Sequence, residues 1–208
     1  RKDISDDIRS DLNVIAESTE RVRKIVKGLL DFSRQTRLDP ELIDINQLVT
    51  STIKLMENQA LLKGVSVQFK PGKDIPMMII DRNKIESVLL NILINALDAT
   101  KSGDTITIQT TTGVSADDVG HMGVEIVIAD TGCGILPENL NKLFDPFFTT
   151  KEVGSGTGLG LSVSYGIIKE HGGTIRVQSE INKGSTFFIW LPLNQQHFEK
   201  QDLEKQGQ

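Results

Sequence analysis

The stretch Ile85-Glu-Ser-Val-Leu-Leu-Asn-Ile-Leu-Ile-Asn-Ala-Leu-Asp-Ala99 decides the fold of this chain. It is apolar nearly all round, which predicts a buried helix over residues 82–100 that begins after the N-cap residue Asp81. A buried helix needs other elements packed around it, and the neighbouring segments are expected to supply them. Its apolar residues are Ile85, Val88, Leu89, Leu90, Ile92, Leu93, Ile94 and Leu97.

One side of this helix is polar. Ser87, Asn91, Asn95 and Asp98 recur at i, i+4, i+8 and i+11, which places them in one narrow polar stripe. Burying an unpaired amide costs about 1–3 kcal/mol, so we expect the stripe to face a polar cavity or a ligand. Asparagine carbonyl oxygens are hard donors that suit Mg²⁺. Two asparagines bonded to backbone inside the core would give the same pattern, and this helix alone does not separate the two interpretations.

The segments around this helix alternate between helical and strand patterns. A helix over 45–63 is expected between the N-cap residue Asp44 and Gly64, a short helix after Pro137, and another over 159–171. Strands come in adjacent pairs, which predicts a mixed or antiparallel sheet with the helices on one face. The predicted fold is therefore α+β, a two-layer α/β sandwich that is neither a Rossmann nor a P-loop arrangement. The expected strands are 65–69, 76–80, 104–112, 123–130, 173–179 and 186–193.

Residues 1–38 are predicted to form one long helix, over 3–37, with an apolar seam along one side. Such a helix cannot bury its seam alone. We expect it to be half of an intermolecular or hairpin bundle, and the alternative is a helix folded back on its own domain. Pro40 requires the helix to end. The remaining divisions are a linker over 39–44, a domain over 45–194 and a polar tail over 195–208 that we expect to be disordered.

The composition excludes several kinds of protein. The 208 residues are 38% hydrophobic and 25% charged, which is ordinary for a soluble domain with an appendage. A net charge of −5 argues against binding to nucleic acid or to an anionic membrane surface. The single Cys133 excludes an internal disulfide and a thiolate metal cluster, and it fits a reducing compartment.

The sequence also bears on location. No apolar run approaches the roughly 18–20 residues that span a bilayer, and the N-terminus has no signal-peptide pattern, so we expect a cytoplasmic location. Because the first residue is Arg1, we expect a fragment or a processed chain. The histidines His121, His171 and His197 are expected in surface or capping positions.

Asp130 ends a predicted strand and precedes the turn Thr131-Gly-Cys-Gly134. A carboxylate in this place can accept a hydrogen bond from the amino group of adenine, whereas guanine would present a second acceptor. Gly132 and Gly134 would let the backbone come close to a base. A type I turn after a strand would also explain the motif.

The segment Gly154-Ser-Gly-Thr-Gly-Leu-Gly-Leu161 opens a predicted helix. Its free amides and the helix dipole favour phosphate groups. The spacing is that of neither a Walker A loop nor a dinucleotide-binding loop, and a flexible linker is the alternative. Upstream, Phe144, Phe147, Phe148 and Lys151 suggest a mobile lid whose lysine reaches a phosphate, although Phe144 also fits core packing.

Taken together, these four motifs resemble the N, G1, F and G2 boxes of bacterial sensor histidine kinases in the GHKL superfamily of ATP-binding domains. The resemblance covers about residues 45–194 and is nearest to the nitrogen-regulator sensor subgroup. Residues 26–34 resemble the second helix of the dimerisation and phosphotransfer hairpin of the same kinases.

The resemblance implies ATP or ADP with Mg²⁺ as ligands and gives individual residues roles. Asn95 matches the Mg²⁺ ligand, and Asn91 stands where hydrolytic relatives have a Glu general base. Asp130 matches the adenine carboxylate and Lys151 the lid cation, while Asp98 replaces a Lys found in other members. Asn91, Asn95 and Lys151 are thus the expected catalytic residues. Further nucleotide contacts are expected from Asp98, Gly132, Gly134, Ile135, Phe148, Gly156, Thr157, Gly158, Leu159, Gly160, Leu161 and Thr186.

Residues 1–38 contain no histidine, so the phosphoacceptor helix of such a kinase is missing. The expected function is the ATP side of a histidine kinase, which transfers the γ-phosphate to a histidine on another helix for relay to the aspartate of a response-regulator receiver domain. The resemblance also implies a homodimer in the full-length protein. A GHKL ATPase, which a Glu at position 91 would have favoured, and a non-catalytic ATP-sensing module are the alternatives.

Overall fold

The computed structural model describes residues 38–114, 121–151 and 157–193, together with isolated helical positions between residues 8 and 23. Most of the predicted helix over 3–37, the predicted tail over 195–208 and the predicted phosphate-loop residue Gly156 lie outside the described residues.

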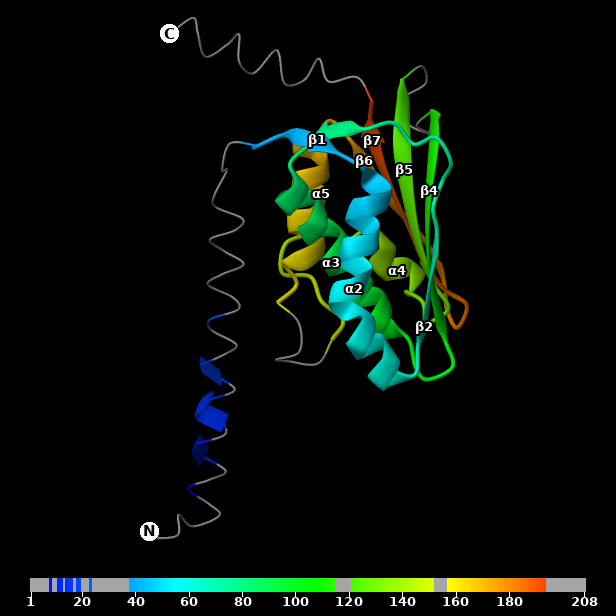
Figure 1. Ribbon diagram of the computed structural model, residues 1–208. Helices are drawn as coiled ribbons and strands as arrows, with labels where there is room; N and C mark the ends of the chain where they lie inside the picture. Colours follow the sequence, from blue (N-terminus) through cyan, green and yellow to red (C-terminus); the bar gives the residue numbers. More distant parts are fainter. Residues whose placement is uncertain are drawn as a thin grey trace, which may run out of the picture.

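The domain has two layers, as predicted. One layer is a five-stranded sheet in the order β2-β4-β5-β7-β6, in which β2 and β4 are parallel and the other neighbours antiparallel. The longer helices α2, α3 and α5 lie on one face of this sheet (Figure 1). The strands are β2 (Ser66–Lys70), β4 (Thr105–Val114), β5 (Met122–Asp130), β6 (Thr174–Glu180) and β7 (Gly184–Pro192). The helices are α2 (Ile45–Lys63), α3 (Arg82–Ala99), α5 (Gly160–Glu170) and the short α4 (Pro137–Leu140).

A second, two-stranded sheet lies where the chain enters the domain. A linker is predicted over 39–44, but Glu41–Ile43 form β1, which pairs antiparallel with β3 (Met78–Ile80). Three residues are too few for a periodic strand signal, and the partner strand is distant in sequence, so local patterns could not identify this pairing. The strand predicted over 76–80 therefore belongs to this small sheet and not to the main one.

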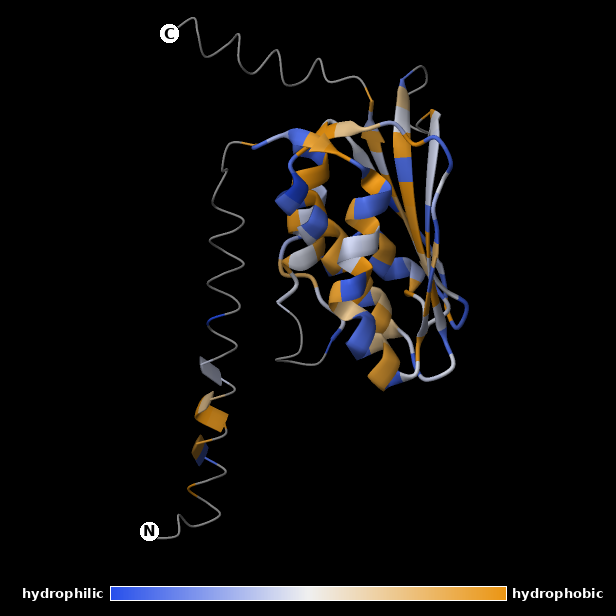
Figure 2. Ribbon diagram, viewed as in Figure 1, coloured by the Kyte–Doolittle hydropathy of each residue, from blue (hydrophilic) through white to orange (hydrophobic). Residues whose placement is uncertain are grey.

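Helix α3 lies between α2 and α5 and packs on the sheet. Its side chains Ile85, Leu89, Ile92 and Leu93 are fully buried, which is worth about 1.5–3 kcal/mol each. Figure 2 shows the hydrophobic colour concentrated on the helix sides and strands between the two layers. The helix is not buried all round, however, because Ile94 is 44% exposed on its outer side.

The predicted helix boundaries are confirmed by their caps. The Asp44 carboxylate accepts a hydrogen bond from the Gln47 amide at 3.1 Å, and Gly64 ends α2 with a left-handed φ of 72°. The Asp81 carboxylate accepts from the Lys84 amide at 3.0 Å at the start of α3. None of the helices in the described ranges is both long and apolar enough to cross a bilayer.

His171 is the C-cap residue of α5, in agreement with the expected capping position, and it is buried, with only 4% of its surface exposed. Its Nε2 accepts a hydrogen bond from the Asp81 amide at 3.1 Å, so the ring proton is on Nδ1 and is donated to the Ile167 carbonyl at 2.8 Å. Burial lowers the pKa of His171, while Asp81 and Glu170 oppose that change and Lys84 adds to it.

The change His171→Gln removes this titrating group and keeps an oxygen that can accept from the Asp81 amide. Because the pKa of His171 is lowered on folding, the unfolded chain takes up a proton at a higher pH than the folded chain. Stability that is present above about pH 6.5 is therefore lost as the pH falls toward the folded-state pKa. We expect the free energy of unfolding, measured by urea denaturation, to fall more between about pH 7 and pH 5 for the wild type than for the variant.

The histidines His121 and His197 are present in both the wild type and the variant, so their titration does not change the difference in stability between the two. Equal losses of stability over that pH range would contradict the assignment of a buried neutral His171.

Candidate functional site

The outer side of α3 carries a connected polar cluster. Asn95 Oδ1 accepts a hydrogen bond from Lys151 Nζ at 3.0 Å, and the same ammonium forms an ion pair with Asp98 Oδ2 at 2.5 Å. One turn earlier, Asn91 Nδ2 donates to Ser164 Oγ on α5 at 3.0 Å. These contacts are to side chains of other elements, so the stripe is not a pair of asparagines bonded to core backbone. The structure thus brings together Asn91, Asn95, Asp98 and Lys151, as predicted.

The glycines before α5 are packed closely against this cluster. A Cβ atom on Gly160 would lie 2.3 Å from Asn91 Oδ1, so any larger residue there would displace the Asn91 amide from its present position. Gly158 has a φ of +67°, and a Cβ there would lie 2.4 Å from the Phe147 carbonyl carbon. The first amides of a helix have no acceptor within the helix, and here they start beside Asn91. Of the neighbours expected to contact the nucleotide, Leu159 is buried, while Thr157 and Leu161 are half-buried.

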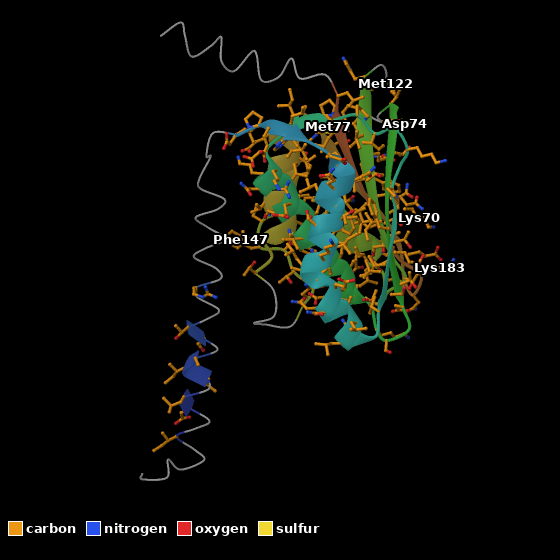
Figure 3. The ribbon with its side chains drawn as sticks, in the orientation of Figure 1. Lys70, Asp74, Met77, Met122, Phe147 and Lys183 are labelled. Carbon is orange, nitrogen blue, oxygen red and sulfur yellow. The ribbon has the colours of Figure 1, made fainter. Side chains whose placement is uncertain are left out.

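The phenylalanines before the glycines differ in how they are packed. Phe144 packs against the hydrophobic core and against the Tyr165 ring, with 5.4 Å between ring centroids, which confirms the core interpretation for this residue. Phe147 is 60% exposed with a φ of 68°, and Phe148 is half-buried. Figure 3 shows Phe147 projecting on the helical side of the molecule, far from the labelled Lys183.

Asp130 lies beside the turn that contacts the C-terminal end of α3. Its Oδ1 accepts hydrogen bonds from the Gly132 amide at 2.9 Å and the Ser185 amide at 3.3 Å. The Cys133 amide donates to the carbonyl of Ala99 at 3.0 Å, which attaches the turn to the C-terminal end of α3. The turn therefore stands at one end of the polar stripe.

The same turn also contacts the β6–β7 hairpin. A Cβ atom on Gly134, whose φ is +71°, would lie 2.2 Å from the Glu180 carbonyl oxygen. The Ile135 amide donates to Ser179 Oγ at 2.8 Å. Gly134 and Ile135 therefore hold the turn between the sheet and α3, and the close packing against backbone explains the glycine.

The Asp130 carboxyl is in an unusual electrostatic position. It is only 6% exposed, and burial raises its pKa, while the hydrogen bonds from Gly132 and Ser185 act in the opposite direction. Both of these bonds use Oδ1, so Oδ2 can accept from a donor on a ligand. A buried carboxyl with a perturbed pKa beside a polar stripe is a candidate binding group.

Thr186, predicted to lie near the base, is not brought to this site. It pairs with Ala129 on β5 and Gln178 on β6, on the face of the sheet opposite to Asp130. Ser185 takes the expected place instead, because it is 4% exposed and its amide contacts Asp130. The alternation of Ser185 with the buried apolar residues that follow it is a signal that could have identified it, since residues two apart share a face. Those apolar residues are Phe187, Ile189 and Leu191.

The two parts of the site lie along one helix. From Asn91 to Ala99 the rise of α3 is about 12 Å. The Asp130 turn is attached at the Ala99 end, the glycine backbone of α5 lies beside Asn91 at the other end, and Lys151 is bonded between them to Asn95 and Asp98. This arrangement suits an elongated ligand that has a hydrogen-bond donor at one end and negative charge over the remainder. Across the described ranges, no group of three or more His, Cys, Asp or Glu residues could hold a metal ion.

A groove of about 390 Å³ lies elsewhere, between the start of α2 and the end of β2. It is lined by Asn46, Gln47, Thr50, Ser51, Lys54, Phe69 and Pro71. None of the clustered residues on α3 or in the Asp130 turn borders it, so it is separate from the candidate site.

Comparison with known proteins gives a consistent result. The family model for histidine kinase-, DNA gyrase B-, and HSP90-like ATPases matches residues 80–195. Sensor kinase CckA of Brucella abortus (strain 2308) is 39% identical over 90% of this chain, and sensor histidine kinase ZraS of Escherichia coli (strain K12) is 36% identical over 87%. The chain spans 21% of the length of CckA and 37% of that of ZraS.

Solved structures agree with this match. Histidine kinase ThkA, in a complex with response regulator protein TrrA, aligns with a TM-score of 0.72 at 27% identity. The alignment covers 92% of this chain and 53% of that chain. The two-layer fold described above is therefore shared with a histidine kinase.

The change Asp130→Asn separates stability from ligand binding. Asparagine keeps an oxygen for the Gly132 and Ser185 amides and removes a carboxylate whose pKa is raised by burial. A raised pKa in the folded state means that ionisation opposes folding above the unfolded-state pKa, so the variant should be more stable than the wild type at pH 7. Its amide NH₂ would meet the amino group of adenine, so affinity for ATP should fall toward that for GTP.

Thermal unfolding at about pH 7 and calorimetric titration with ATP and GTP measure these two effects. A variant that is less stable at neutral pH and still prefers ATP as the wild type does would contradict the role of Asp130.

Proposed function

The chain belongs to the family of histidine kinase-, DNA gyrase B-, and HSP90-like ATPases, and we propose that it acts as the ATP-binding catalytic domain of a sensor histidine kinase. In this function the domain transfers the γ-phosphate of ATP to a histidine on a helix that residues 1–38 do not supply. The supporting observation is the neutral Asn91, bonded to Ser164, beside the cluster of Lys151, Asn95 and Asp98.

Asn91 favours transfer to an imidazole over hydrolysis. Attack by water on a phosphate needs a group that orients the water and accepts its proton, whereas a neutral imidazole nitrogen attacks without that help. Asn91 has no basic oxygen, and its Nδ2 is already donated to Ser164. Asn91 is therefore not available as a base for water.

The other residues of the site would bind and orient ATP. Asp130 Oδ2 would accept from the adenine amino group, and the amides at the start of α5 would donate to phosphate oxygens. The ammonium of Lys151 would leave Asp98 for the γ-phosphate, where it would offset the negative charge that spreads over the phosphoryl oxygens during transfer. Asn95 and Asn91 would hold the phosphate end of the ligand on α3.

The same cluster fits Mg²⁺. Asn95 Oδ1 already accepts from a cationic group, the Lys151 ammonium at 3.0 Å, which identifies it as an oxygen placed to hold positive charge. Amide and carboxylate oxygens are suitable ligands for Mg²⁺, which usually completes its coordination with phosphate oxygens and water. Asn95 would hold the ion, with Asp98 nearby, and the bound ion would offset charge on the β- and γ-phosphates.

Two kinds of partner follow from this function. The first is a histidine-bearing helix, which must reach the phosphate end of the site near Lys151. The second is a response-regulator receiver domain, which is supported by the ThkA structure because ThkA is complexed there with the regulator TrrA. A homodimer in the longer protein would present the histidine helix beside each domain.

A non-catalytic ATP-sensing module is the second candidate. Turnover separates the two. With a histidine hairpin domain from a histidine kinase supplied as a separate polypeptide, a catalytic domain labels that hairpin from γ-labelled ATP, and a sensing module does not.

The change Asn95→Ala tests the phosphate end of the site. We expect affinity for ATP with Mg²⁺ to fall about tenfold, which corresponds to 1.4 kcal/mol, and labelling of the supplied hairpin to be lost. Asn83→Ala is the matched control, because Asn83 is an exposed asparagine on the same helix. Calorimetric titration and the labelling assay measure the two effects. If Asn95→Ala matched Asn83→Ala in both, Asn95 would have no role in binding or transfer.

A further inference from the structure

The point where the chain enters the domain is bonded directly to α3. The Asp39 amide donates a hydrogen bond to Asp81 Oδ2 at 3.1 Å, while Asp81 Oδ1 accepts from the Lys84 amide at 3.0 Å. One carboxylate therefore holds both the entering segment and the first turn of α3. The pairing of Glu41 with Ile80 in the β1–β3 sheet brings the same two segments together.

The same point is bonded to α5. The Asp81 amide donates to His171 Nε2 at 3.1 Å, and His171 ends α5 with its Nδ1 bonded to the Ile167 carbonyl. Beside it, Lys84 Nζ and Glu170 Oε2 form an ion pair at 2.8 Å that joins α3 to α5 a second time. The entering segment, α3 and α5 therefore meet at one junction.

Both helices reach the candidate site at their far ends. Helix α3 starts at the junction and carries Asn91 and Asn95, and α5 runs from Gly160 at the nucleotide loop to the junction. For a displacement as small as the length of a hydrogen bond, we expect each helix to move as one rigid body. A displacement at the junction would therefore change the spacing between Asn91 and Gly160, where a Cβ atom already has no room.

The bond between Asp81 and His171 at the junction is shielded from water, whereas the bond from the exposed Asp39 is partly buried. Asp81 is 6% exposed and His171 4%. Buried hydrogen bonds are stronger electrostatically than exposed ones, and leaving a buried partner unsatisfied costs about 1–3 kcal/mol. The bonds are therefore expected to be made or broken together, and not to loosen gradually.

We propose that Asp81 and His171 are positioning residues that couple the segment before residue 39 to the ATP site through α3 and α5. This inference rests on the proposed function, since ATP is the ligand at the far ends of the two helices. Because coupling between two sites is reciprocal, ATP bound at one end stabilises the bonds at the entry point, and strain on the entering segment weakens ATP binding. Upstream helices would then control the ATP site through this junction.

The change Asp39→Pro tests the coupling, because proline has no amide hydrogen to donate to Asp81. Asp39 is exposed, and the Pro40 that follows it favours extended backbone at this position. Asp39→Ala is the matched control, since it removes the side chain and keeps the amide. Affinity for ATP with Mg²⁺ is measured by calorimetry, and amide exchange of residues 41–43 is measured by mass spectrometry with and without nucleotide.

In the wild type and in Asp39→Ala, we expect saturating ATP with Mg²⁺ to slow exchange of residues 41–43. In Asp39→Pro this slowing should be lost and ATP affinity should fall about twofold to tenfold, the range for one hydrogen bond. Asp81→Asn is a second variant, because it keeps an oxygen for the Lys84 amide but turns an NH₂ group toward the Asp39 amide. It should reproduce both effects, even if proline disturbs β1 in its own way.

Unchanged ATP affinity and unchanged slowing of exchange in both Asp39→Pro and Asp81→Asn would overturn the coupling and leave the proposed function in place. A wild-type chain that does not bind ATP would overturn the proposed function, and the coupling with it.

Discussion

The structure depends on one constraint, which is that α3 has to be apolar toward the sheet and polar on its outer side. The inner side supplies Ile85, Leu89, Ile92 and Leu93 to the core. The outer side presents Asn91, Asn95 and Asp98, against which the fold places Lys151 and Gly160. Because the same rigid helix carries the core and the site, packing of the core sets the position of the ligand-binding groups.

The two ends of α3 are secured by different means. At its start, the Asp81 carboxylate caps the helix and binds the Asp39 amide. At its end, the Ala99 carbonyl accepts from the Cys133 amide in the turn that follows Asp130. The helix therefore links the entry of the chain, the phosphate end of the site and the adenine end in one element. One helix thereby sets the positions of both an acceptor and a cation.

Most of the fold and about half of the site geometry could be predicted from local patterns. Asp44 and Asp81 as caps, Gly64 as a helix end and the polar stripe on α3 follow from residue type and helical period, so they needed no tertiary information. β1 could not be predicted because its three residues acquire their structure from pairing with β3. The ion pair between Asp98 and Lys151 depends on how a loop 53 residues away in sequence folds back, which no local pattern contains.

Thr186 and Ser185 show that a motif match has to be checked against the face of the strand on which each residue lies. The two hydroxyl residues are adjacent in sequence, but strand alternation sends them to opposite faces of the sheet, and only Ser185 meets Asp130. His171 shows the reverse case, since its place before a glycine pair resembles a surface helix end, and only the tertiary contact with Asp81 buries it. Both outcomes depend on which face or neighbour the completed fold presents.

The central claim is that α3, the Asp130 turn and the start of α5 form one site for an adenine nucleotide. Calorimetric titration of the wild-type chain with ATP in the presence of Mg²⁺ tests it most directly. The account predicts saturable binding at one site with a dissociation constant of about 1 mM or below, in the range of working substrate levels. A folded chain that releases or absorbs no binding heat at several-fold higher nucleotide concentration, and whose melting temperature does not change with nucleotide, would contradict it.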